Sequence, residues 1–274
     1  SNDGFNLYNL LEIRFFLRQL ELAEDTFIIS DDLWSDAKRK LIDRFGKSPN
    51  LEVCVNLIKD FEFTNPKIKY KSDLEVFIRE SKLEDFYGEK VETVFVSTMH
   101  KAKGREFDNV FLMLDQFSIG TDEDIRQLYV AMTRAKYTLN IHYNGNYLDF
   151  IKAEDMNRVF DRKIYLPPRQ LAMQLTFKDV WLDYFFSCRH LVRQLNSGDE
   201  LIIDGGVCRN SRGQVILKFS KQFINQIESM KQKSYKPKIA KVKLIVYWHK
   251  ENTEQEIRII LPEIYFESVK GTGL

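Results

Sequence analysis

Residues 91–114 read VETVFVSTMHKAKGREFDNVFLML, in which two apolar runs flank a polar loop. The runs at 91–97 and 109–114 are rich in β-branched and aromatic residues, and polar residues do not alternate with them. Because continuous apolar runs of this length are typical of strands buried on both faces, they predict two strands of a parallel sheet covered on both sides.

The chain that follows continues this alternation of strands and helices. Thr121 and the three acidic residues after it indicate the start of a helix, since acidic groups favour the first turn, and this helix is predicted to run to about Arg134. Residues 137–143 alternate between apolar and polar and predict a third strand. Strand, loop, strand, helix and strand in this order indicate an α/β fold.

Residues 5–88 show helical periodicity and contain no cluster of charged residues that suggests chemistry. Apolar residues recur at spacings typical of one helix face, beginning with Leu10, Ile13, Leu17 and Leu20. Capping and breaking residues predict three more helices, over about residues 33–45, 50–58 and 74–78.

Beyond Pro167 and Pro168, which mark a linker, the pattern changes. A helical stretch is predicted near 180–194, and a helix near 222–230 interrupts a series of short strands. Those strands are predicted at 215–219, 240–248 and 255–261. Short strands around one inserted helix suggest a small β-barrel.

The composition excludes several classes of protein. Lysine and arginine number 41 and aspartate and glutamate 40, so a net charge of +1 argues against a surface that binds nucleic acid everywhere, although a local basic groove is compatible with it. Three widely spaced cysteines without a CxxC pair indicate reduced thiols and a cytoplasmic protein, and they predict no metal site. No apolar run reaches the roughly 18 residues of a membrane-spanning helix.

Two motifs give the chain a family resemblance. Residues 98–107, TMHKAKGREF, resemble motif V of superfamily 1 helicases of the UvrD/Rep type, whose pattern is T-x-H-x-A-K-G-x-E-F after a buried strand. Residues 126–136, RQLYVAMTRAK, are similar to motif VI and follow Glu123 and Asp124. The resemblance covers about residues 91–145. It implies that this is the C-terminal part of an ATP-dependent DNA helicase, in a class that includes DNA repair enzymes.

The resemblance implies a division into domains. Residues 1–88 would be a helical segment in the place of an accessory domain, and residues 89–166 a RecA-like second motor domain with motifs V and VI. Residues 167–274 would be a C-terminal accessory domain, and UvrD-type helicases can carry an SH3-like or Tudor-like barrel there.

The resemblance also implies a nucleotide site. Arg134 matches the motif VI arginine that reaches the γ-phosphate, where a fixed guanidinium stabilises the charge of phosphoryl transfer, so it is the predicted catalytic residue. Glu106 matches the glutamate that faces the ribose, and Gly104 permits a close backbone approach. Tyr129 and Val130 of the same motif are predicted to be core residues.

On the DNA side, Thr98 and His100 match residues that lie beside the single strand, as a hydroxyl and an imidazole suit phosphate contacts. Lys101 is added on electrostatic grounds alone, and Lys103 suits either a phosphate or the loop's own carbonyls. A further basic run, at 231–243, is either a solvated face or, through its neighbour Tyr235, a nucleic acid contact.

The sequence contains no GxxxxGK[ST] phosphate loop and no acidic DExx box. ATP and Mg²⁺ are therefore expected only in the intact enzyme, where an N-terminal motor domain of the same polypeptide supplies those motifs, and this fragment alone is expected to be inactive. The expected partners are single-stranded or partly duplex DNA and that missing domain, with no membrane.

A second interpretation belongs to another class. The helicase-derived fold would then be a non-catalytic scaffold, and residues 176–274 would recruit a protein or nucleic acid partner. The two interpretations differ in the effect expected from Arg134→Ala, which removes turnover in the first and leaves partner binding intact in the second.

Overall fold

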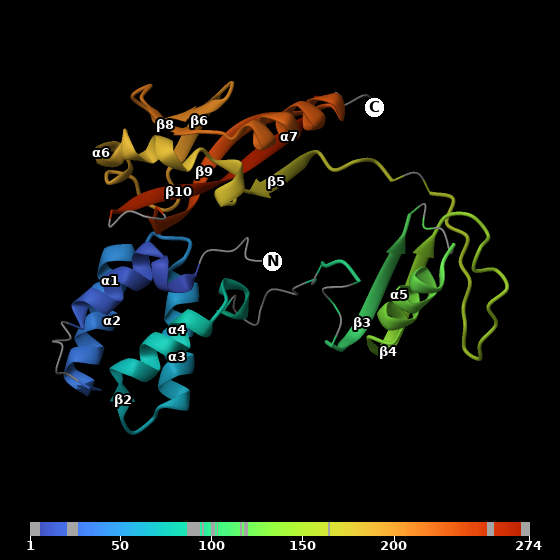
Figure 1. The fold of residues 1–274 in the computed structure, drawn as a ribbon, viewed down its shortest axis with the longest axis horizontal. Coiled ribbons are helices and arrows are strands. Elements are labelled where there is room, and N and C mark those ends of the chain that lie inside the picture. Colours follow the sequence, from blue (N-terminus) through green and yellow to red (C-terminus); the bar gives the residue numbers. More distant parts are fainter. Residues whose placement is uncertain are drawn as a thin grey trace. The chain divides into compact units, whose positions relative to one another are not determined.

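The chain folds into two compact units in the computed structural model (Figure 1). Unit 1 contains Ser1–Val91 and Leu166–Leu274, and unit 2 contains Glu92–Tyr165. The structure describes residues 6–20, 27–86, 94, 96–99, 102, 104–115, 117, 120–163, 165–250 and 255–269. The helical segment and the C-terminal segment, which the sequence suggested were separate domains, thus fall in one unit because they share an apolar core.

The N-terminal part of unit 1 contains the four predicted helices. They are α1 (Leu11–Gln19), α2 (Asp31–Phe45), α3 (Leu51–Thr64) and α4 (Lys71–Glu80). The 3₁₀ turns η1 (Leu7–Asn9) and η2 (Leu83–Phe86) and the antiparallel pair β1 (Ile28–Ile29) and β2 (Lys69–Tyr70) were not predicted, since two-residue strands have no periodicity to detect.

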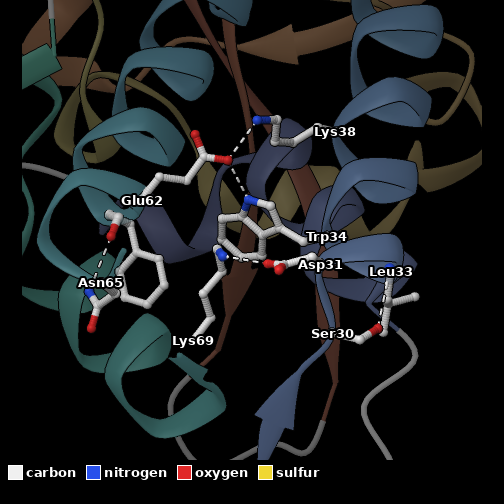
Figure 2. Close-up of polar contacts among 9 residues, drawn as sticks. Ser30, Asp31, Leu33, Trp34, Lys38, Glu62, Asn65 and Lys69 are labelled. Atoms are coloured by element: carbon white, nitrogen blue, oxygen red, sulfur yellow. Dashed lines mark hydrogen bonds and ion pairs between the residues drawn. The ribbon is translucent and has the colours of Figure 1, made fainter. Parts of the chain in front are cut away.

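The buried indole of Trp34 connects α2 to α3 and β2 (Figure 2). Its Nε1 donates to Glu62 Oε1 at 2.6 Å, and Lys38 Nζ donates to the same oxygen at 2.6 Å. Lys69 Nζ lies 5.8 Å from the Trp34 ring centroid and 2.8 Å from Asp31 Oδ1. Glu62 therefore satisfies the polar atom of a buried aromatic side chain, which would otherwise be costly to bury.

These contacts give Glu62 a pH-dependent role. Burial alone would raise the pKa of Glu62, but hydrogen bonds from Lys38 and Trp34, with the charges of Lys38 and Lys69, hold that pKa below its usual value. A carboxylate with a lowered folded-state pKa contributes stability above its unfolded-state pKa, and this contribution is lost as the pH falls through the folded-state pKa.

We therefore expect Glu62→Gln to lower the free energy of unfolding at pH 7 by up to about 1 kcal/mol, since solvent screens the partly exposed ion pair. The difference from wild type should shrink as the pH falls below the usual glutamate pKa. Urea unfolding at neutral and acidic pH measures it, with Asp60→Asn as the exposed control on α3. An effect of equal size at both pH values would contradict the assignment.

The C-terminal part of unit 1 is a six-stranded antiparallel sheet in the order β5-β10-β9-β6-β7-β8. The predicted strands are confirmed, the last two being longer than expected, and closure of the sheet into a barrel stays a prediction. The elements are β5 (Gln170–Gln174), β6 (Glu200–Asp204), β7 (Val207–Arg209), β8 (Val215–Lys218), α7 (Lys221–Gln232), β9 (Tyr235–His249) and β10 (Glu256–Ser268).

The helix predicted near residues 180–194 is wrong in its extent. The chain forms two 3₁₀ turns, η3 (Phe177–Asp179) and η4 (Leu182–Phe186), and only one short helix, α6 (Arg189–Val192). Trp181 N donates to Lys218 O at 2.8 Å, so the backbone here is extended beside the end of β8 and unavailable to a helix.

Polar contacts join the helical segment to the sheet at several points. Glu12 of α1 is fully buried, and its Oε1 accepts from Ser197 Oγ of the C-terminal segment at 3.1 Å and from Ser48 Oγ of its own segment at 2.6 Å. Asn50 Nδ2 donates to Lys243 O of β9 at 2.9 Å. Because Glu12 Oε1 and Asn50 Nδ2 each have a partner in the C-terminal segment, separating the two segments would break these hydrogen bonds in a buried setting.

Unit 2 contains the parallel pair β3 (Phe107–Leu114) and β4 (Ala135–Tyr143), connected by α5 (Asp122–Met132). These elements confirm the predicted second strand, helix and third strand. Thr121 begins α5 with a capping box, in which its Oγ1 accepts from Asp124 N at 3.2 Å and Asp124 Oδ2 accepts from Thr121 N at 2.9 Å. A small core contains Leu112, Leu114, Leu128, Ala131 and Leu148.

Two predictions for unit 2 are wrong. Of the strand expected at 91–97, the described residues Val94, Val96 and Ser97 lie outside any strand, and the others are outside the described residues. The described residues also leave one face of the sheet uncovered, since Phe111 is 64% exposed and Met113 is 70% exposed. In the described part of unit 2, α5 is the one helix, and Leu112 and Leu114 point to the face it covers.

The three thiols are buried and unpaired. Burial raises the pKa of Cys188 to about 11 and of Cys208 to about 12, which keeps both protonated and unreactive at neutral pH. Among the described helices, none combines the length and apolar character that a membrane span requires.

Candidate functional site

The two strands of unit 2 bring the predicted motif V and motif VI regions together. Since β3 and β4 are parallel, their first residues, Phe107 and Ala135, pair with each other. Phe107 N donates to Arg134 O at 2.9 Å just before β4. Residues 104–106 therefore lie at the same end of the sheet as the last turn of α5.

The Arg134 side chain spans this junction. Its Nε donates to Val130 O at 2.8 Å, its Nη2 to Thr133 Oγ1 at 3.1 Å and its Nη1 to Arg105 O at 3.3 Å. A guanidinium has five N–H donors, so two have no partner among the described residues. Arg134 thus holds the loop before β3 against α5 and still presents donors at its tip.

The loop before β3 turns sharply at Gly104. This glycine has a φ of +83°, and a side chain at its position would meet nothing within 4 Å. The left-handed backbone is the reason for a glycine here, and the open space would allow another group to approach the backbone closely. Arg105 N donates to Ala102 O at 3.1 Å, and Ala102 N to Thr98 O at 3.2 Å, which closes the loop.

The structure brings part of the predicted site together. Glu106 and Thr98 are exposed, and Glu106 directly precedes the residue that bonds to Arg134. His100, Lys101 and Lys103 lie outside the described residues, so their predicted roles stay predictions. Among the described residues, no group of His, Cys, Asp or Glu could hold a metal ion.

Sequence reasoning misjudged two residues of the motif VI helix. Tyr129 was predicted to be core but is 68% exposed. Val130 is half-buried, and its carbonyl positions Arg134, a role for which a side-chain pattern gives no signal. A hollow of about 730 Å³ in unit 2 is lined by Met132 of α5, the second half of β4 and residues between 145 and 162, and none of the candidate site residues lines it.

The basic run at 231–243 has the character of a solvated face. Three of its lysines form ion pairs, Lys231 with Glu228, Lys238 with Glu267 and Lys241 with Glu200. Tyr235, the aromatic residue expected to contact nucleic acid, is only 5% exposed. Tyr235 is therefore too buried to stack on a base, and the interpretation of residues 231–243 as a nucleic acid contact loses its aromatic residue.

Comparisons with known proteins agree with the motif assignment. Residues 18–146 match the UvrD-like helicase C-terminal domain family. The Gabija protein GajB of Bacillus cereus (strain VD045) is 29% identical over 155 residues, which is 56% of this chain and 29% of GajB. The chain thus spans less than a third of that relative's length. No solved structure gave a significant match.

Proposed function

We propose, from the match of residues 18–146 to the UvrD-like helicase C-terminal domain family, that the chain supplies the second half of an ATP-dependent DNA helicase or translocase. The observation that carries the proposal is the junction of Arg134 with the loop before β3. There, an arginine with two remaining donors lies beside a loop turned by a left-handed glycine.

The residues at this junction suit a nucleotide. Arg134 would contact the γ-phosphate, Gly104 would let the backbone approach, and Glu106 would accept hydrogen bonds from ribose hydroxyls. ATP with Mg²⁺ supplies the phosphoryl group that is transferred. The described residues of this chain contain no carboxylate cluster for the metal ion, so the phosphate-binding half would have to hold it.

The contacts of Arg134 suggest how the two halves would cooperate. Its Nη1 contact with Arg105 O is long, at 3.3 Å, and is made at the solvent-exposed side. A phosphate oxygen would be a stronger acceptor than a carbonyl, because its negative charge attracts the guanidinium and because phosphate matches the fork of guanidinium donors. Arg134 would therefore exchange the Arg105 carbonyl for a phosphate oxygen.

On the nucleic acid side, exposed Thr98 opens the loop that the resemblance assigns to the single strand, with His100 and Lys101 following it. Phosphate contacts from a hydroxyl and basic side chains would track the strand without reading its sequence. The exposed side chains of Phe111 and Met113 would be covered by further strands and helices of the same motor domain.

The proposal is tested by ATP turnover in two proteins, this chain alone and the longest natural protein that contains it, each with and without single-stranded DNA. We expect no turnover above background from this chain, since it has no phosphate loop, and DNA-stimulated turnover from the longer protein. Turnover by this chain alone, or none by the longer protein, would contradict the proposal. In the second case the scaffold interpretation, with a partner bound by residues 176–274, would replace it.

A further inference from the structure

A groove of about 940 Å³ lies in unit 1, remote in sequence from the helicase motifs. Its lining comes from three places in the chain: residues 180–183, residues 219–221 where β8 leads into α7, and residues 248–250 at the end of β9. The backbone bond from Trp181 N to Lys218 O fixes the first of these against the second. Its volume lies in the range of pockets that bind ligands of nucleotide size or larger.

The groove presents aromatic surface. Trp181 is 52% exposed, although the Tyr184 ring lies 6.3 Å from it between centroids. A second indole in the lining, Trp248, is half-buried and packs edge-on against Phe186 at 6.0 Å. An exposed tryptophan in a hollow offers a flat apolar face, on which planar groups stack.

Positive charge surrounds this aromatic surface. Lys218 Nζ lies 5.3 Å from the Trp181 ring centroid and 4.7 Å from that of Tyr184. Lys221, the first residue of α7, is exposed in the lining. Asp183 is the single acidic side chain among the lining residues, and Lys250 Nζ pairs with it at 2.7 Å. Neither Lys218 nor Lys221 forms an ion pair with another described residue, so their charges are available to a ligand.

We propose that this groove binds a single strand of nucleic acid, with a base stacked on Trp181 and phosphates near Lys218 and Lys221. The ligand that fits must carry planar apolar faces and negative charges in alternation, as a single strand does. An acidic peptide would satisfy the lysines and leave the Trp181 ring unused, while a duplex keeps its bases inside the stack. The groove is formed within unit 1, so this inference does not depend on the proposed role of Arg134.

The test uses the full 274-residue chain and the fluorescence anisotropy of a labelled oligothymidylate of about 12 nucleotides. Trp181→Ala should weaken binding about tenfold, the ordinary effect of removing one stacking aromatic residue, and Trp181→Phe should restore most of the affinity. Arg162→Ala, at an exposed arginine of unit 2, should leave the binding at this groove unchanged.

A pair of charge reversals on α7 provides a matched comparison. Lys221→Glu lies in the groove and should weaken binding and flatten its salt dependence, since each phosphate contact contributes to the slope. Lys233→Glu, an exposed lysine at the opposite end of the same helix, should do neither. This pair keeps the test decisive if Trp181→Ala does not fold, as judged by circular dichroism.

Competitors identify the chemistry that is recognised. Polyglutamate of similar length and inorganic phosphate should displace the oligonucleotide only at far higher concentration. Displacement by polyglutamate at equal concentration would assign the groove to acidic peptides and overturn the proposal. Binding that Trp181→Ala and Lys221→Glu leave at the wild-type value would overturn it as well.

Discussion

Arg134→Ala is expected to lower DNA-stimulated ATP turnover by about a thousandfold or more in the longest natural protein that contains this chain. The reason is that a guanidinium at the γ-phosphate stabilises charge that develops only in the transition state. Because this charge is not yet developed in the ground state, kcat should fall while the KM for ATP changes little. Arg134→Lys should lose most of the activity too, since an ammonium lacks the planar fork of donors.

Arg134 also has a structural role, and the experiment must separate it from the proposed chemistry. The alanine variant loses the bonds to Val130 O and Arg105 O, so its thermal unfolding should be measured beside its turnover. Arg162→Ala is the matched control, because Arg162 is an exposed arginine of the same unit whose side chain forms no hydrogen bond or ion pair with another described residue. Turnover within severalfold of wild type, together with a lower unfolding temperature, would mean that Arg134 has only a structural role. That result would favour the scaffold interpretation.

The elements with strong local signals were predictable. The helices of residues 11–80 have apolar faces and cap residues such as Ser30, whose Oγ accepts from Leu33 N at 3.3 Å (Figure 2). The long strands β9 and β10 contain apolar stretches rich in β-branched and aromatic residues, such as residues 244–248 and 259–261. In the candidate site, the family resemblance assigned Arg134 and Gly104 to one nucleotide site, and the parallel pairing of β3 with β4 brings the loop that contains Gly104 beside Arg134.

The remaining features depend on contacts between distant residues. The 3₁₀ turns near Trp181 arise because its backbone bonds to Lys218, which helical periodicity in the sequence cannot reveal. Tyr129 and Phe111 are exposed because few elements in the described part of unit 2 pack against the sheet and its helix. The groove at Trp181 gathers lysines and indoles from positions about 70 residues apart, and no local pattern joins them.

The joining of residues 1–91 with 166–274 is the feature that departs furthest from the sequence-based division, and Leu10→Ala tests it. Leu10 is fully buried and bridges Val246 of β9, so it lies where the helical segment meets the sheet. Truncating a buried leucine creates a cavity and costs about 3 kcal/mol. In a cooperative unit of this size, that loss lowers the unfolding temperature by about 10 °C.

The cooperativity of unfolding in unit 1 gives a more specific prediction than the loss of stability alone. If unit 1 unfolds as a whole, the slowest-exchanging amides of α3 and of β9 open together, and Leu10→Ala should accelerate both by about a hundredfold, the equivalent of about 3 kcal/mol. Hydrogen exchange followed by mass spectrometry measures the two segments in one sample. Leu139→Ala, on β4 of unit 2, is the control that should leave both unchanged. Acceleration in α3 with β9 at its wild-type rate would mean that the helical segment and the sheet fold independently, as the sequence alone suggested.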